Sequence, residues 1–358
     1  MKRIIIAVSD DLNTDQRVLR IAGSLKAMGF DVFLLGRTTP ASQPLNIDFR
    51  AKRFKLLANR GMAFYALLNW RLFCYLLFHK FDVALANDLD TLAGVSLAAR
   101  LKRRPVVYDS HEYFTELPEL VGRPAKRKVW LKAEQMFVPH VFAAYTVCDS
   151  LGAIYSEKYG KTFAVVRNLP YRKADTPQAE KRNVVMYQGA LNVGRGIDLM
   201  IDAMRYLPDC ELWIAGAGDV ESDLHQRAEA SGYGQRIKFL GRLSPDKLRI
   251  VTSQAKVGLS VEEDMGLNYH YALPNKLFDY IQACVPVVVA NLPEMRKVVE
   301  DYGVGEVLAE RSAEVLAQTI GRVMANATTY EPRLQQAAGQ LCWENECVRL
   351  KEIYSPLL

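Results

Sequence analysis

Short apolar segments alternate with amphipathic segments along the whole chain, and this alternation restricts the possible folds more than any other feature. Apolar runs predict strands, and apolar residues spaced three to four positions apart predict helices. Strands that alternate with helices imply βαβ units and a parallel sheet. In the first half, the pattern predicts strands at 2–9, 31–36, 81–86, 105–108, 144–148 and 163–167, and helices at 15–28 and 89–101.

The alternation stops at residues 168–182, a segment with two prolines, mixed charges and no apolar period, which predicts a linker. It then restarts, with strands predicted at 184–187, 211–215, 237–240, 257–261 and 286–290, and helices at 197–206, 220–230, 245–253, 275–283, 313–325 and 332–353. We therefore expect an α/β protein with two doubly wound, Rossmann-like domains at 1–170 and 171–340. The last helix, about 340–358, is a candidate to pack back on the first domain. Ligands of such domains bind at the C-terminal ends of the strands.

Length and composition agree with two ordinary globular domains. The chain has 358 residues, of which 50% are hydrophobic and 24% are charged, and this excludes a disordered chain, a collagen-like fibre and a disulfide-stapled miniprotein. The six cysteines form no C-x-x-C pair, so we expect free thiols in a reducing cytosol and no metal site. The first apolar run is too short for a secretion signal.

The net positive charge of the chain comes from its first half. Residues 1–170 carry 25 Lys and Arg against 15 Asp and Glu, a net charge of +10, whereas the rest of the chain has a net charge of −4. Such a half usually meets an anionic partner: a phosphate ligand, a membrane surface or nucleic acid. We expect no nucleic acid, because no nucleic-acid-binding motif is recognisable.

Residues 61–78 are almost wholly apolar and contain one charge, Arg71. The segment approaches membrane-spanning length, but Arg71 would cost about 2.5–3.5 kcal/mol at the bilayer centre, and a span would split a parallel sheet. We therefore expect no transmembrane helix. Two alternatives stay open: a helix that lies on an anionic membrane surface, and a helix packed against the sheet.

Two glycine-rich junctions in the second half run from a strand into a helix. In YQGALNVGRG, Gly189 permits close approach of a ligand, and Arg195 offers a planar fork of donors suited to phosphate oxygens. In WIAGAGD, Gly216 and Gly218 form a weaker G-x-G pattern. A tight turn without a ligand remains the alternative for both junctions.

The segment LPNKLFDYIQACVPVVVAN predicts a helix that begins just after Pro274. Lys276 lies in its first turn, where the helix dipole prefers an anion, so a bound anion would explain a lysine there. Asp279 lies three residues further on the same face and could accept hydrogen bonds from ribose hydroxyls. The alternative is a surface ion pair between these two residues.

Polar residues follow the strand ends of the first half. His111 comes directly after a buried strand, where an imidazole can bind a sugar hydroxyl or polarise a leaving phosphate, or can simply bond the backbone. Asp88 and Asp90 follow the preceding strand, and Asp90 could equally cap a helix. The loop after the first strand is rich in Asp and could bind acceptor hydroxyls or cap the next helix.

Residues 184–291 resemble the nucleotide-sugar domain of GT-B glycosyltransferases of family 4 (glycosyl transferases group 1). The motifs that carry this resemblance are YQGALNVGRGID, LWIAGAGD, IKFLGRLSPDKL and LPNKLFDYIQACVPVVVAN. The first half is similar to a variant of the family at NTDQRVLRIAGSLKAMGFDV, NDLDTL and VVYDSHE. The resemblance implies the GT-B fold, with two Rossmann-like domains that face a central cleft.

The resemblance also assigns residues. The family's phosphate-binding pair falls on Ala190 and Arg195, and its E-x7-E pair falls on Tyr271 and Asp279, so one arginine and one glutamate are replaced. Lys276 is a candidate for the missing arginine. The candidates for the missing glutamate are Glu262, Glu263 and Asp264.

The resemblance thus implies three sets of functional residues. The catalytic set is His111, Arg195 and Lys276. The donor-binding set is Gly189, Arg195, Gly216, Gly218, Asn275, Lys276, Leu277 and Asp279. The acceptor-side set is Asp10, Asn13, Asp88 and Glu112.

The implied activity is that of a retaining, metal-independent hexosyltransferase that needs no cofactor. It would move a sugar from a nucleotide diphosphate, UDP ahead of GDP, to a glycan or lipid-linked acceptor in cell-surface polysaccharide synthesis. We expect a cytoplasmic enzyme, peripheral on the inner face of the membrane if its basic half binds lipid. Two alternatives stay open: a nucleotide-sugar epimerase of GT-B fold, and a binding protein in which Ala190 and Tyr271 impair catalysis.

Overall fold

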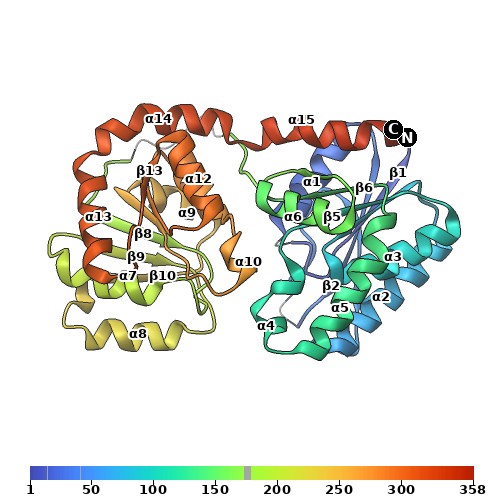
Figure 1. Ribbon diagram of the computed structural model, residues 1–358, viewed down its shortest axis with the longest axis horizontal. Coiled ribbons are helices and arrows are strands. Elements are labelled where there is room, and N and C mark those ends of the chain that lie inside the picture. The colour runs from blue at the N-terminus through green and yellow to red at the C-terminus, as the bar shows by residue number, and fades with distance from the viewer. Residues whose placement is uncertain (14, 41, 173–178) are drawn as a thin grey trace. The chain divides into compact units, whose positions relative to one another are not determined.

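The computed structural model describes residues 1–13, 15–40, 42–172 and 179–358. Two compact units make up the chain: unit 1 contains Met1–Asn168 and Glu346–Leu358, and unit 2 contains Leu169–Asn345. Each unit holds one parallel sheet with helices packed on it (Figure 1). The predicted α/β class with two Rossmann-like domains is confirmed. Residues 173–178 of the expected linker lie outside the described residues.

The sheet of unit 1 has the order β3-β2-β1-β4-β5-β6-β7. Its strands are β1 (Arg3–Ala7), β2 (Asp31–Thr38), β3 (Arg50–Lys55), β4 (Val83–Asn87), β5 (Val106–Ser110), β6 (Ala143–Thr146) and β7 (Phe163–Val165). The chain leaves β1 and β4 toward opposite edges of the sheet, so the ligand-binding switch point of this unit lies between these two strands. The sequence did not predict β3, because four of its six residues are basic and its pattern of burial is that of an exposed edge strand.

The helices of unit 1 follow the apolar spacing of the sequence, and Asp15 caps the first of them by accepting a hydrogen bond from the Val18 backbone N–H. They are α1 (Gln16–Ala27), α2 (Gly61–Phe78), α3 (Leu89–Lys102), α4 (Pro118–Val121), α5 (Pro124–Phe137) and α6 (Asp149–Tyr159). The helix α2 packs along α3 through a buried stripe at every fourth residue, namely Phe64, Leu68, Leu72 and Leu76. By length and composition, α2 is also the one helix in the described part of the chain that could cross a membrane.

The sheet of unit 2 has six strands in the order β10-β9-β8-β11-β12-β13, which corresponds to the first six strands in the unit 1 order. Its strands are β8 (Val184–Gln188), β9 (Glu211–Ala215), β10 (Ile237–Gly241), β11 (Val257–Ser260), β12 (Val287–Val289) and β13 (Gly305–Val307). Its helices are α7 (Ile197–Ala203), α8 (Glu221–Ala230), α9 (Pro245–Ser253), α10 (Leu267–His270), α11 (Asn275–Gln282), α12 (Pro293–Tyr302), α13 (Ala313–Ala325) and α14 (Ala327–Gln340). The switch point of this unit lies between β8 and β11.

The single helix predicted at 332–353 is wrong, because two helices occupy this region. The first is α14, which contains Pro332 in its interior, and the second is α15 (Trp343–Tyr354). From Glu346 onward the chain belongs to unit 1, where the ring of Tyr354 lies edge-on to Phe30 and Tyr145. Short 3-10 helices complete the fold at Phe114–Glu116, Val138–His140, Met204–Tyr206, Gly234–Arg236 and Ser355–Leu357.

Candidate functional site

Two glycine-rich loops of unit 2 meet at the carboxyl ends of β8 and β9. Gly216 has a φ of +152°, and a Cβ built on it would lie 1.8 Å from the carbonyl oxygen of Gly189. A Cβ on Gly218 would lie 2.3 Å from the carbonyl oxygen of Leu191. Only glycine permits this contact between the loops, so Gly216 and Gly218 hold the Gly189 loop in position.

Arg195 follows the Gly189 loop and lies beside the ring of Tyr269. Its Nε atom is buried and makes no hydrogen bond within the described residues, and the guanidinium carbon lies 5.3 Å from the centre of the Tyr269 ring. A buried guanidinium nitrogen without an acceptor is costly. The side chain is therefore suited to receive an anion, for which its planar fork of donors offers two parallel hydrogen bonds.

Lys276 lies beside this loop, but it forms a buried ion pair with Glu262. The Lys276 Nζ atom is 2.6 Å from Glu262 Oε1 and 4.2 Å from the centre of the Tyr187 ring, and Ser260 donates a hydrogen bond to the other oxygen of Glu262. Burial would raise the pKa of Glu262, but the ammonium group of Lys276 outweighs this and lowers it. Burial lowers the pKa of Lys276, and the nearby charge of Arg195 lowers it further. The positive charge of Lys276 is therefore already balanced by the carboxylate of Glu262.

Asp279, one turn further along α11, joins a chain of hydrogen bonds to the end of β8. Its Oδ2 accepts a hydrogen bond from Gln188 Nε2 at 2.9 Å, and Gln188 Oε1 accepts one from Thr252 Oγ1 at 2.7 Å. These residues line a cavity of about 110 Å³ together with Arg249, whose buried Nε has no hydrogen-bond partner in the described chain. The remaining donor-set residues, Asn275 and Leu277, begin α11, with Asn275 exposed and Leu277 in the core.

In unit 1, four charged side chains form a network at the carboxyl ends of β4 and β5. Arg17 makes two hydrogen bonds to Asp109, at 2.9 and 2.7 Å, and both side chains are buried. His111 Nε2 lies 3.2 Å from Asp109 Oδ2, and His111 Nδ1 lies 3.0 Å from Asp88 Oδ2. Asp88 Oδ1 also accepts a hydrogen bond from the backbone N–H of His111.

These contacts determine the state of His111. Burial would lower its pKa, but the charges of Asp88 and Asp109 and their hydrogen bonds raise the pKa well above its ordinary value. The imidazolium form donates from both ring nitrogens, which matches the two carboxylates. Both ring nitrogens of His111 therefore have protein partners, and one of these bonds must break before the imidazole can bind a sugar hydroxyl or a leaving phosphate.

Asp88 has an unusual backbone conformation, with φ of +56° and ψ of +167°. This region is essentially reserved for glycine, and an aspartate in it costs about 1–3 kcal/mol. The two hydrogen bonds of its carboxylate to His111 hold it there. Strain of this kind clusters at functional sites.

The other acceptor-side residues have structural partners. Asp10 is exposed and accepts a hydrogen bond from the backbone N–H of Asp11. The side-chain amide of Asn13 holds the backbone of the 42–46 loop, by donating to Pro44 and accepting from Asn46. Glu112 is exposed beside His111.

Comparison with known proteins agrees with this geometry. The family model for glycosyl transferases group 1 matches residues 171–340, and the model for the glycosyl transferase 4-like domain matches residues 14–170. The chain belongs to the group 1 glycosyltransferases of GT-B fold. None of the curated protein sequences matches the chain.

Solved glycosyltransferase structures share the fold of this glycosyltransferase over its whole length. Sucrose-phosphate synthase (tll1590) from Thermosynechococcus elongatus is 16% identical, with a TM-score of 0.79 over 100% of this chain and 99% of that one. Anabaena Alr3699/HepE in complex with UDP-glucose is 15% identical, with a TM-score of 0.77 over 99% and 100%. WaaG, a glycosyltransferase involved in lipopolysaccharide biosynthesis, is 14% identical, with a TM-score of 0.71 over 98% and 99%.

The acidic residues suggested to replace the family glutamate at Tyr271 all have side-chain partners in this glycosyltransferase. Glu262 pairs with Lys276, Glu263 lies 2.8 Å from Arg311, and Asp264 lies 2.8 Å from the imidazole of His270. In the described residues, no group of three or more His, Cys, Asp and Glu side chains is placed to hold a metal ion.

Sequence reasoning missed Arg17, Asp109 and the pairing partner of Lys276. Arg17 carried a signal, because it lies on the same face of α1 as the buried Ile21. A charged residue in such a stripe needs a buried counter-charge. Asp109 and Glu262 could not be paired from sequence, since their partners lie 92 and 14 residues away.

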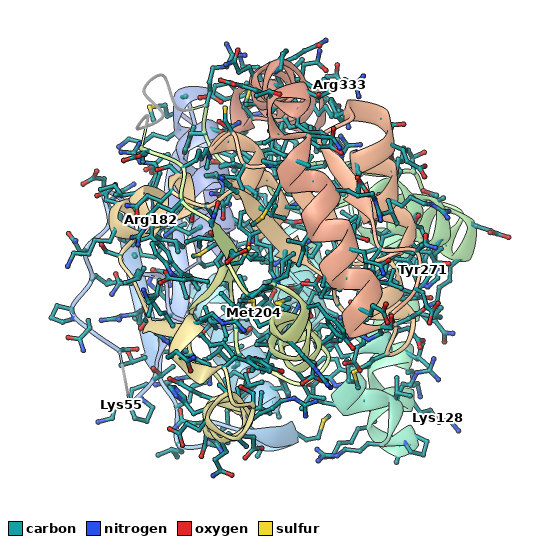
Figure 2. All side chains as sticks on the ribbon, turned by 90° about the vertical axis from the view of Figure 1, so that its left-hand side faces the viewer. Lys55, Lys128, Arg182, Met204, Tyr271 and Arg333 are labelled. Carbon is teal, nitrogen blue, oxygen red and sulfur yellow. The ribbon has the colours of Figure 1, made fainter. Side chains whose placement is uncertain are left out.

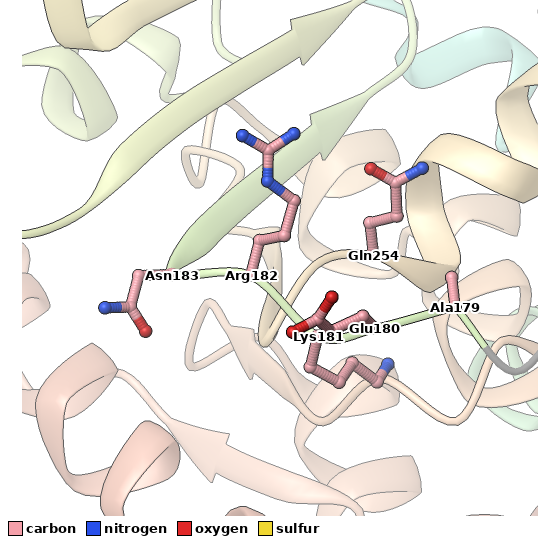
Figure 3. Close-up of a pocket in the computed structure, with 6 residues that line it drawn as sticks. All are labelled: Ala179, Glu180, Lys181, Arg182, Asn183 and Gln254. Atoms are coloured by element: carbon pink, nitrogen blue, oxygen red, sulfur yellow. The ribbon is translucent and has the colours of Figure 1, made fainter.

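A depression of about 610 Å³ lies at the amino-terminal ends of the unit 2 strands, away from the glycine-rich loops (Figure 3). It is lined by Ala179, Glu180, Lys181, Arg182, Asn183 and Gln254, which precede the starts of β8 and β11. Lys181 donates to the carbonyl oxygens of Ala255 and Cys284, and Arg182 lies 5.0 Å from the centre of the Trp213 ring. Lys181 and Arg182 thus already have contacts within the protein. The depression also lies at the amino ends of the strands, whereas ligands of such sheets bind at the carboxyl ends, so we do not take it as the functional site.

Proposed function

We propose that the enzyme transfers a hexose, with retention of configuration, from a nucleotide diphosphate to a hydroxyl of a glycan or lipid-linked acceptor in cell-surface polysaccharide synthesis. The observation that carries the proposal is the Arg195 side chain, whose buried Nε makes no hydrogen bond in the described chain, at the switch point of a group 1 glycosyltransferase domain. Anabaena Alr3699/HepE, which shares the fold, is solved in complex with UDP and with UDP-glucose, which supports UDP as the donor nucleotide here.

The chemistry needs positive charge where the diphosphate leaves. Arg195 supplies a permanent positive charge at this place, which supports transfer without an added metal ion or cofactor. Asp279 would accept hydrogen bonds from the ribose, for which it must share its Gln188 contact. Lys276 acts mainly through its field, because its ammonium group is bonded to Glu262.

Nucleotide binding is expected to stabilise the enzyme. UDP at one hundred times its Kd should add about 2.7 kcal/mol to the free energy of unfolding. The measurement is a thermal-shift series with UDP, GDP, ADP and their sugars, with and without EDTA, on the wild type and on Asp279→Ala. A shift that is largest for UDP, persists in EDTA and shrinks in the variant is the expected result. No shift with any nucleotide would contradict the proposed function.

The products separate the two alternative functions. A GT-B epimerase would convert the nucleotide sugar without an acceptor, and the new epimer would appear by anion-exchange chromatography. A binding protein would shift with a nucleotide but release neither free sugar nor glycoside from UDP-glucose, with acceptors or without them.

We also propose that unit 1 docks on the anionic, cytoplasmic face of a membrane through α2. Outside its buried stripe, this helix exposes Trp70 (61% exposed) and Phe78 (81% exposed), and the exposed Arg60, Arg71 and Lys80 lie on or beside it. Lys55 on β3 and Lys128 on α5 also point into solvent (Figure 2). Aromatic residues beside basic ones are typical of helices that lie in a lipid interface. In the described chain no disulfide joins any of the six cysteines, which fits a reducing compartment.

Trp70 provides a native reporter for this docking, because Trp130, Trp213 and Trp343 are buried. Vesicles with 30% phosphatidylglycerol are expected to shift the tryptophan emission to the blue and to sediment the protein, and salt should weaken both effects. Phe78→Glu should weaken binding about tenfold. Val348→Glu, at an exposed position of α15, adds the same charge and should not. Equal binding to pure phosphatidylcholine, or none at low salt, would contradict the proposal.

A further inference from the structure

A second loop of unit 2 holds the backbone on the N-terminal side of Arg195. This loop follows β11 and comprises residues 261–266, and we call it the β11 loop. Its Glu263 donates a backbone N–H to the carbonyl oxygen of Gly194 at 2.8 Å. Gly194 has a φ of +80°, and a Cβ built on it would lie 2.5 Å from the sulfur of Met265, so the two loops are in close contact there.

The β11 loop also holds the backbone on the C-terminal side of Arg195. Gly196 has a φ of +71°, and a Cβ built on it would lie 2.2 Å from the carbonyl oxygen of Val261. A larger residue would push the two loops apart. Because both neighbours of Arg195 contact the β11 loop, a shift of that loop would move the backbone from which the guanidinium extends.

Arg311 fixes the β11 loop from the far side of the sheet. It lies after β13, directly before Ser312, whose side chain caps α13 by accepting a hydrogen bond from the Val315 backbone N–H. Its guanidinium donates to the carbonyl oxygen of Val261 at 2.8 Å and to Glu263 Oε1 at 2.8 Å. These are the two residues of the β11 loop whose backbones contact the glycines.

The alternative is an ordinary surface ion pair. Contact with Glu263 alone would fit this alternative, since both side chains are about one-third exposed and such pairs contribute little. The bond to Val261 differs, because Val261 is fully buried and a buried carbonyl group that loses its donor is costly. Loss of the Arg311 side chain is therefore expected to displace the β11 loop and not only to remove a surface charge.

We propose that Arg311 is a positioning residue for the donor diphosphate: through the β11 loop, it holds Arg195 where the phosphates bind. The role toward the diphosphate rests on the proposed function. The connection from Arg311 to the Arg195 backbone lies wholly within unit 2 and can be tested without a nucleotide.

The first test is hydrogen exchange of the full chain without ligand, followed by mass spectrometry. In Arg311→Ala, amides in peptides covering 191–200 and 261–266 should exchange about tenfold faster than in the wild type, because local opening becomes easier. Arg311→Lys keeps the charge and a donor, so its rates should be intermediate. Arg322→Ala removes an arginine of α13 that pairs with Glu306 on the surface, and it should exchange as the wild type. Unchanged rates in peptides from unit 1 show that each variant is folded.

The second test is a double-mutant cycle on the Kd of UDP, measured by calorimetry. Arg311→Ala should weaken UDP binding about fivefold in the wild type but not in the Arg195→Ala background, where the loop has no guanidinium to position. A direct effect of the Arg311 charge on the phosphates would weaken binding in both backgrounds.

Either of two outcomes would overturn the proposal: unaltered exchange of both loops in Arg311→Ala, or equal weakening of UDP binding in both backgrounds. If the wild type binds no UDP, the proposed function is contradicted, and the exchange rates alone decide whether Arg311 holds the Arg195 backbone. If UDP binds but exchange is unaltered, only the role of Arg311 is contradicted.

Discussion

Replacing Arg195 by alanine is expected to weaken UDP binding about 10- to 100-fold. The variant loses hydrogen bonds between a guanidinium and a phosphate, and a hydrogen bond to a charged group contributes about 1.5–3 kcal/mol. The nearby Lys276 cannot take over, because its ammonium group is bonded to Glu262. The measurement is the Kd of UDP by isothermal titration calorimetry.

Two further variants define the role of Arg195. Arg195→Lys keeps the charge but not the planar fork, so its Kd should lie between those of the wild type and Arg195→Ala. Arg227→Ala removes an arginine that pairs with Asp202 on the surface and should leave the Kd unchanged. Unaltered UDP affinity in Arg195→Ala would show that the diphosphate binds elsewhere.

Replacing Lys276 by alanine is expected to lower the free energy of unfolding by about 3–5 kcal/mol, which is the typical cost of removing one partner from a buried ion pair. Glu262 would remain fully buried without its counter-charge, and only neutral donors, among them the Ser260 hydroxyl, would be left in the described chain. The double variant Lys276→Met with Glu262→Gln should recover most of this loss, because neither charge remains. Urea unfolding of the three proteins at pH 8 measures these differences.

The loss in Lys276→Ala should also depend on pH. In the wild type the folded-state pKa of Glu262 is lowered, so its contribution is present above the pKa of the unfolded chain and is lost as the pH falls through the folded value. In the variant the pKa of the unpaired Glu262 is raised by burial, and protonation relieves the penalty. The deficit should therefore be smaller at pH 5 than at pH 8. A variant as stable as the wild type at pH 8 would show that the pair contributes little.

The strands with uniformly apolar sequences could be predicted, because strands covered on both faces leave an unmistakable pattern. Strand β3 could not, since an edge strand can be made of arginine and lysine, and β13 has only three residues. The last helix was predicted as one, because the break at Leu341 and Cys342 contains neither glycine nor proline.

From the sequence, only those site residues could be predicted that lie within a recognisable motif. Arg195 and Asp279 could be assigned from motifs, because each lies at a recognisable strand-to-helix junction. The pairing of Lys276 with Glu262 and of His111 with two aspartates depends on which strands are neighbours in the sheet, which no single segment encodes.

The return of α15 to unit 1 has a consequence for synthesis on the ribosome. Unit 2 is a continuous stretch of chain and can fold as soon as it has emerged, whereas unit 1 lacks Glu346–Leu358 until these residues, which follow unit 2, have been made. Until then Phe30 and Tyr145 have no Tyr354 to cover them. Unit 1 is thus synthesised first but completed last. Before α15 has been made, unit 1 exposes an apolar surface to which chaperones can bind.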